Sequence, residues 1–128
     1  MSAGTRDRST TERGHDLTWV EPLAHDALVE FYDRRLGQPD LAHSLARAHG
    51  ALWCRAAHGQ PLGRELDRFE ATLQRVGLGH ADLAEGNAAV ARELLQLTRE
   101  RFRRSARGGA EMAAELAGLD ERVARATA

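Results

Sequence analysis

The sequence predicts an all-α fold. Apolar residues recur at intervals of three and four, and no stretch alternates between apolar and polar residues as a half-buried strand would. Glycine and proline stand at the ends of the periodic stretches, where helices begin and end. Together these two observations divide the chain into five expected helices.

The first expected helix begins at Thr18 and stops at Gly37. Thr18 and Glu21 have the spacing of a capping box, with Pro22 directly behind them. Its apolar face carries Leu23, Ala27, Leu28, Phe31 and Leu36. Tyr32 lies along one edge of this face, where its hydroxyl needs either a polar partner in the core or a pocket to point into.

Four further helices are expected along the rest of the chain. They cover about 40–57, 62–76, 80–104 and, after a glycine-rich break at 105–109, a last segment with Met112, Leu116, Leu119 and Val123 on one stripe. Gly59 with Pro61 ends the first of these four helices, and Gly77 with Gly79 ends the second.

Length and composition limit the organisation of the chain. Its 128 residues are enough for one domain with its own core, which we expect at 17–126. Residues 1–16 are polar and are expected to form a disordered tail. No apolar run approaches the roughly 20 residues of a membrane helix, so we expect no membrane partner. Cys54 has no second cysteine to pair with, which favours a cytoplasmic protein.

Charge and polar residues exclude several classes of function. The net charge is −1 and all 18 basic residues are arginine, so no overall positive field attracts nucleic acid, and we expect no nucleic-acid partner. The histidines lack the spacings of zinc or di-iron ligands. Ser44 and Cys54 lack the neighbours of a catalytic nucleophile, so we do not expect a hydrolase, and a role without catalysis is favoured.

One ordered set of residues lies in the first two thirds of the chain: Phe31, Tyr32, Leu36, Pro39, Trp53, Gly59 and the run Val76, Gly77, Leu78. This order resembles that of bacterial globins, both the truncated haemoglobins and the globin domains of globin-coupled sensors. The resemblance implies a globin-like bundle of about five main helices around one apolar pocket. It also implies haem as the cofactor, with the tyrosine hydroxyl over its distal face.

The position of the iron ligand depends on how the chain is matched to these families, in which one histidine holds the haem iron. Matching Val76 and its two neighbours to the Ile-Gly-Leu of sensor globins places that histidine on Leu73. The truncated-haemoglobin register from Gly63 places it on Glu70. A gapped match to the sensor-type Gly-x-x-His-Ala supplies His80, which we take as the expected metal ligand.

The resemblance therefore implies a haem protein that binds or senses a diatomic gas such as oxygen. Tyr32 would donate a hydrogen bond to the bound gas, and His49 would line the distal side. The other residues expected around the haem are Leu28, Phe31, Trp53, Phe69 and Leu73. His80 as a helix cap and His49 as an ordinary core histidine are the competing interpretations.

Leu73 at a ligand position keeps a second function open. A haem-free relative would be a sensory or helical dimerisation module, and it would bind an apolar ligand or a protein partner. A homodimer through the last two helices, about 83 to 123, is the oligomer expected for such a module.

Overall fold

The computed structural model describes residues 18–128, so the tail predicted at 1–16 lies outside the described residues. This part of the chain is all-helical, as the sequence predicts, and it contains no strand. Its helices are α2 (Val20–Leu36), α3 (Pro39–Ala57), α4 (Arg64–Arg75), α5 (His80–Arg101) and α6 (Ala106–Ala126). None of them is both long and apolar enough to cross a membrane.

Most helix ends lie where glycine and proline predict them. Gly37 follows α2 in a left-handed conformation with φ 66°, and its N–H donates to the Asp33 carbonyl. Pro39 occupies the first position of α3, where its missing N–H costs no helical hydrogen bond. Gly77, with φ 85°, follows α4. At these positions the backbone conformation itself selects the residue type.

Two helix starts differ from the prediction. The cap of α2 is Trp19 rather than Thr18, and its side chain makes no capping hydrogen bond. α6 begins at Ala106, because the Ser105 hydroxyl accepts a hydrogen bond from the Gly108 N–H at 3.1 Å. The two glycines that looked like a break therefore belong to the first turn of α6, and the serine cap offsets their low helix propensity.

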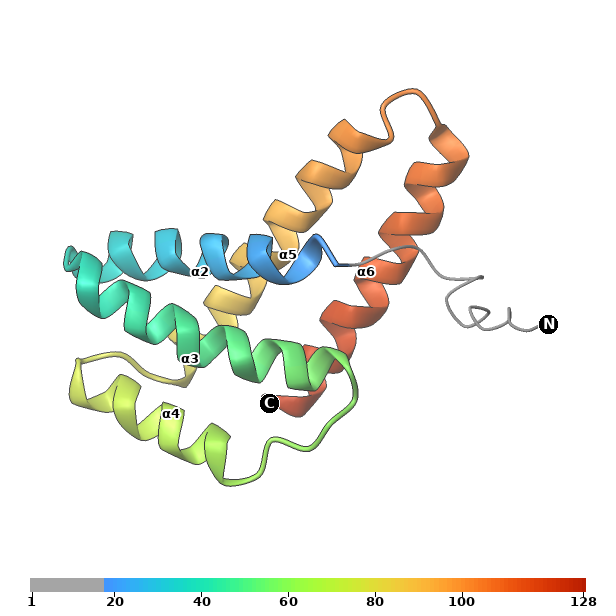
Figure 1. Ribbon diagram of the computed structural model, residues 1–128. Helices are drawn as coiled ribbons and strands as arrows, with labels where there is room; N and C mark the ends of the chain where they lie inside the picture. Colours follow the sequence, from blue (N-terminus) through green and yellow to red (C-terminus); the bar gives the residue numbers. More distant parts are fainter. Residues whose placement is uncertain (1–17) are drawn as a thin grey trace.

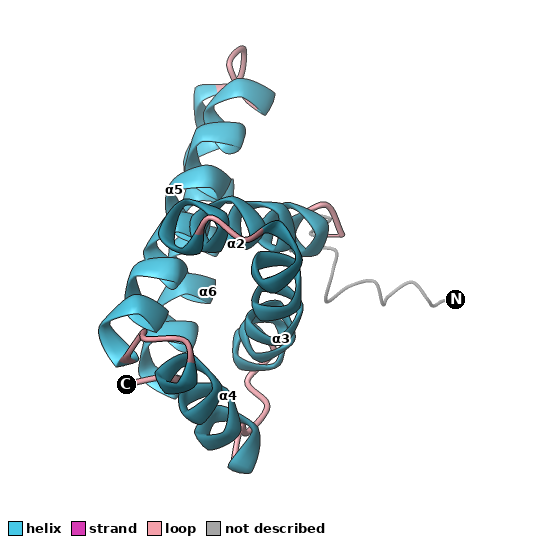
Figure 2. Ribbon diagram, turned by 90° about the vertical axis from the view of Figure 1, so that its left-hand side faces the viewer, coloured by secondary structure: helices cyan, strands magenta, loops and turns pink. Residues whose placement is uncertain are grey.

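The helices pack around one core, with α2 against both α3 and α5, and α6 against both α5 and α3. Figure 1 shows α2 and α3 running side by side in opposite directions, with α4 along the far side of α3 and α5 passing behind α2. In the end-on view of Figure 2, the axes of α2, α3, α4 and α5 surround a centre. Buried side chains fill that centre, and the largest of them include Leu28, Tyr32, His49 and Leu73.

Two parts of the fold are less embedded than the rest. α4 contributes only Phe69 and Leu73 to the buried residues. The second half of α5 and the first half of α6 form a two-helix arm that extends beyond α2 and α3 in Figure 1. Arg101 at the end of α5 lies over the Trp19 ring, 5.0 Å from its centroid, and links the arm to the start of α2.

Candidate functional site

Tyr32 and His49, both expected around a haem, meet in the centre of the core. The Tyr32 hydroxyl donates a hydrogen bond to Nδ1 of His49 over 2.8 Å. Tyr32 has no exposed surface, and His49 is 1% exposed. His49 is thus the polar partner that a tyrosine at the edge of the apolar face requires.

The hydrogen bond between these two side chains continues across the protein. His49 Nε2 lies 2.8 Å from Oδ1 of Asn87, and Asn87 Nδ2 donates to the Thr127 hydroxyl over 3.1 Å. That hydroxyl donates in turn to the Val123 carbonyl over 2.8 Å. We call Tyr32, His49, Asn87 and Thr127 the core hydrogen-bond chain. It joins α2, α3, α5 and the end of α6.

The order of donors assigns every proton in the core hydrogen-bond chain. Because the Thr127 hydroxyl donates its only proton to the Val123 carbonyl, it must accept a hydrogen bond from the Asn87 amide nitrogen. Oδ1 of Asn87 then accepts from His49, so the imidazole carries its proton on Nε2. His49 Nδ1 is left as an acceptor for Tyr32. Each polar group therefore has a partner, which a buried network requires.

Burial keeps both ring side chains neutral. It lowers the pKa of His49 to about 4, against an opposing effect of the hydrogen bond that His49 donates to Asn87. It raises the pKa of Tyr32 far above its ordinary value, with a smaller contribution from the Asp82 carboxylate. A general acid or base must reach its substrate. Every residue of the core hydrogen-bond chain is buried, and the most exposed, Asn87, is 6% exposed, so the chain serves to position helices.

Gly86 allows α5 to approach His49 closely. A Cβ atom at this position would lie 2.8 Å from His49 Cε1 and 3.3 Å from Leu28 Cδ2. Real side chains do not approach as closely as the first distance, so His49 would have to move. Its ring cannot move without losing the hydrogen bonds to Tyr32 and Asn87.

Phe69 connects α4 to these buried rings. Its ring centroid lies 5.3 Å from that of His49 and 6.5 Å from that of Tyr32. Phe31 packs edge-on against the other side of Tyr32 at 5.0 Å. The structure therefore gathers Phe31, Phe69, Tyr32 and His49 into one aromatic cluster at the position where the resemblance implies a pocket.

The expected iron ligand lies apart from this cluster. His80 is the first residue of α5, and its side chain is 50% exposed. Its Nδ1 lies 2.5 Å from a carboxylate oxygen of Glu70. Trp53, another residue expected around the haem, is also buried. It lies outside the aromatic cluster and lines a groove between α5 and α6.

As they stand, the described residues do not fit a haem group. A haem would need a cavity among these side chains. Leu28, Tyr32 and Leu73 each have 0% exposure, and a side chain without accessible surface has no water-sized space beside it. The Tyr32 hydroxyl is already bound to His49, and Leu73 cannot ligate iron. Among residues 18–128, no three His, Cys, Asp or Glu side chains are arranged to hold a metal ion.

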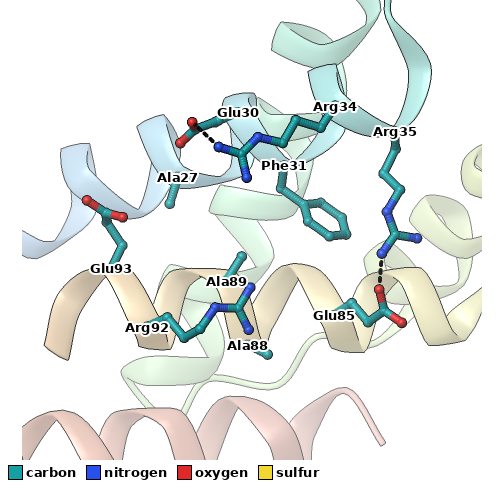
Figure 3. A pocket seen from close by; sticks show the side chains of 10 residues that line it. All are labelled: Ala27, Glu30, Phe31, Arg34, Arg35, Glu85, Ala88, Ala89, Arg92 and Glu93. Carbon is teal, nitrogen blue, oxygen red and sulfur yellow. Dashed lines mark hydrogen bonds and ion pairs between the residues drawn. The ribbon is translucent and has the colours of Figure 1, made fainter. Parts of the chain in front are cut away.

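Open space lies on the surface instead. The groove of Figure 3, between α2 and α5, has a volume of about 440 Å³ and is lined by three arginines and three glutamates. Its formal charges cancel, and the Arg34–Glu30 and Arg35–Glu85 pairs already occupy four of these six side chains. The lining of this groove therefore favours neither an anionic nor a cationic ligand.

A second groove, between α3 and α4, is mostly apolar and has a volume of about 360 Å³. We call it the α3–α4 groove. Its lining residues are Leu41, Ser44, Leu45, Ala48, Ala51, Leu52, Arg55, Glu65, Arg68, Phe69 and Thr72. Neither Tyr32, His49 nor His80 lines this groove or the groove between α2 and α5.

Sequence reasoning missed several of the residues that make up this site. Asn87 lies on the apolar stripe of α5, four residues after Leu83 and three before Val90, and a polar residue at such a position signals a buried partner. Thr127 follows Val123 by one helical turn and so extends the apolar stripe of α6 by a polar residue. The α3–α4 groove could have been recognised from Ala48 and Ala51. These two exposed alanines lie within a stripe of leucines, where small side chains leave space.

Comparison of the chain with protein-family models, with curated proteins and with solved structures found no match. The function is therefore argued from the chain's own residues.

We expect Gly86→Ala to destabilise the protein by about 1–3 kcal/mol, because the new methyl group displaces His49 from its hydrogen bonds. Gly118→Ala on α6 is the matched control, since its methyl group would meet only Arg122 Nη1 at 3.9 Å. This control substitution should stabilise the protein by up to about 1 kcal/mol, because alanine has a higher helix propensity than glycine. Urea unfolding gives the free energy of unfolding of both variants. A Gly86→Ala variant as stable as the unmodified protein would contradict the close approach of α5 to His49.

Stability should depend on pH through His49. Its folded pKa of about 4 lies below its ordinary value of 6.5, so the unfolded chain binds the proton more readily. The contribution of neutral His49 is fully present above pH 6.5 and is lost as the pH falls toward 4, by about 3 kcal/mol.

The measurement is the free energy of unfolding from pH 4 to 7 for the unmodified protein and for His49→Gln. Acidic groups common to both proteins cancel in the difference. The advantage of the unmodified protein should shrink as the pH falls. A difference that stays constant over this range would show that His49 does not titrate as argued.

Proposed function

We propose that this chain is a haem-free, globin-like sensory module that binds an apolar small molecule in the α3–α4 groove. The carrying observation is the groove itself, a mostly apolar channel of about 360 Å³ that the described residues leave open. Small-molecule sites span about 300–1,000 Å³ and are lined mainly by apolar side chains. Its volume suits a small molecule better than a partner helix.

Phe69 supplies a route from the groove to the core. It lines the α3–α4 groove, and its ring also packs 5.3 Å from that of His49. A ligand that shifts Phe69 therefore acts on the core hydrogen-bond chain. Because this chain reaches α2, α5 and α6, occupancy of the groove is coupled to the packing of those helices.

α4 is the element suited to respond. Only two of its residues are buried, so little apolar contact holds it against α3 and α5. A ligand between α3 and α4 adds apolar contact on the inner face of α4. Ligand binding should therefore order this helix.

The haem-based function needs larger changes. His80 would have to leave Glu70, and the cluster around Tyr32 would have to open to admit the macrocycle. For this reason we keep the globin-like arrangement that the resemblance implies and propose that the haem has been lost from it.

Binding of Nile red, an uncharged apolar dye, tests the proposal by fluorescence titration. Ala48→Trp fills the α3–α4 groove and should weaken dye binding at least about tenfold, the loss of about 1.4 kcal/mol. Ala84→Trp places the same side chain on an exposed part of α5 away from the groove, and it should leave binding unchanged.

Haemin serves as the competing ligand in the same experiment. We expect haemin to give no stoichiometric Soret band. A stoichiometric band, whether or not it is lost in His80→Ala, would contradict the haem-free proposal. Dye binding that is unchanged in Ala48→Trp would contradict the assignment of the ligand to the α3–α4 groove.

A homodimer through the α5–α6 arm is a second proposal, and one observation favours it. Leu95 is 37% exposed, and it borders a groove of about 190 Å³ with Trp53, Ala91 and Ala113. A second copy placed about a two-fold axis would cover the leucine, and the alanines allow its helices to approach closely.

Light scattering after size exclusion tests the dimer. The unmodified protein should have twice the 14.0 kDa mass of the chain. Leu95→Glu should give the monomer mass, because a carboxylate at the interface would be desolvated. Gln96→Glu adds the same charge at the next exposed residue of α5 and should remain dimeric. A monomeric unmodified protein would refute this proposal alone.

A further inference from the structure

The α3–α4 groove is apolar along most of its length but carries charge near one end. Its charged lining residues are Arg55, Glu65 and Arg68. The chain turns back between Ala57 and Arg64, so Arg55 near the end of α3 lies beside the first turn of α4. The opposite end, where Leu41 and Thr72 lie, has no charged lining residue.

Two of these three charges neutralise each other. Arg55 Nη1 lies 3.6 Å from the Glu65 carboxylate, and Arg55 Nη2 donates to the Pro61 carbonyl over 2.6 Å. Glu65 therefore has its counter-ion. The Nε of Arg55 is buried without a hydrogen-bond partner among the described residues, which leaves positive potential at this end of the groove.

Arg68 is the unbalanced charge of the groove. No acidic side chain in the described part of the chain lies within ion-pair distance of its guanidinium, and the side chain is exposed at the rim. The nearby Thr72 hydroxyl donates to the Arg68 carbonyl and accepts from Arg75, so it is not available to a ligand as a free donor. The groove thus combines an apolar channel with one free cation.

We infer that the ligand of the α3–α4 groove is an amphiphile with an anionic head, of the fatty-acid class. Its carboxylate binds Arg68 at the charged end, and its acyl chain lies along Leu52, Leu45 and Leu41 of α3. This inference rests on the proposed function, because it names the chemical class of the apolar ligand. A guanidinium matches a carboxylate in shape as well as charge.

Displacement of Nile red by three compounds with ten-carbon chains tests the head group. The compounds are decanoate, decan-1-ol and decyltrimethylammonium, with the two charged compounds below their micelle concentrations and the alcohol below its solubility limit. Decanoate should displace the dye at about fivefold lower concentration than the alcohol, the gain from one exposed ion pair. The ammonium compound should be the weakest. High salt should reduce the preference for decanoate.

Two variants assign the preference to Arg68. Arg68→Ala should make decanoate and decan-1-ol equal while leaving displacement by the alcohol unchanged. Arg64→Ala is the matched control, because it removes the same charge from the exposed start of α4 without lining the groove. This control should keep the fivefold preference.

The outcomes separate the inference from the proposed function. Equal displacement by decanoate and decan-1-ol in the unmodified protein overturns the anionic head and leaves the apolar site in place. An equal loss of preference in Arg64→Ala and Arg68→Ala overturns the assignment to Arg68. Failure of Nile red to bind overturns the proposed function, and the inference falls with it.

Discussion

The hydrogen bond between Tyr32 and His49 is the constraint on which the rest of the structure depends. It places two polar groups in the buried core, so each needs its hydrogen-bond partners within the protein. Asn87 on α5 and Thr127 after α6 supply them, and Gly86 makes the approach possible. One polar pair thereby determines where four helices meet.

This constraint also explains why the interior does not fit haem. A tyrosine that would face a bound gas here donates to a neutral histidine, and Phe69 packs against both rings. The space that the resemblance assigns to the macrocycle is occupied by side chains. Because Phe69 also lines the α3–α4 groove, the same packing that closes the core leaves an opening beside it.

Most of the fold could be predicted, whereas much of the site could not. Apolar spacing and the glycines at 37, 59 and 77 place all five helices within a few residues, because these signals act over one or two turns. The predicted start of α6 was wrong, because the capping hydrogen bond of Ser105 outweighs the low helix propensity of two glycines. The meeting of Tyr32 with His49 joins residues 17 apart, and that of His49 with Asn87 residues 38 apart, separations over which periodicity carries no information.

The sequence by itself determined the all-helical class, the boundaries of most helices and the need of Tyr32 for a buried polar partner, since each follows from local geometry or from the chemistry of one side chain. Only the tertiary structure decided which partner that is. It also placed His80 at the surface beside Glu70 and opened the α3–α4 groove beneath Arg68. These outcomes depend on how helices cross, and crossing is set by the packing of many side chains at once.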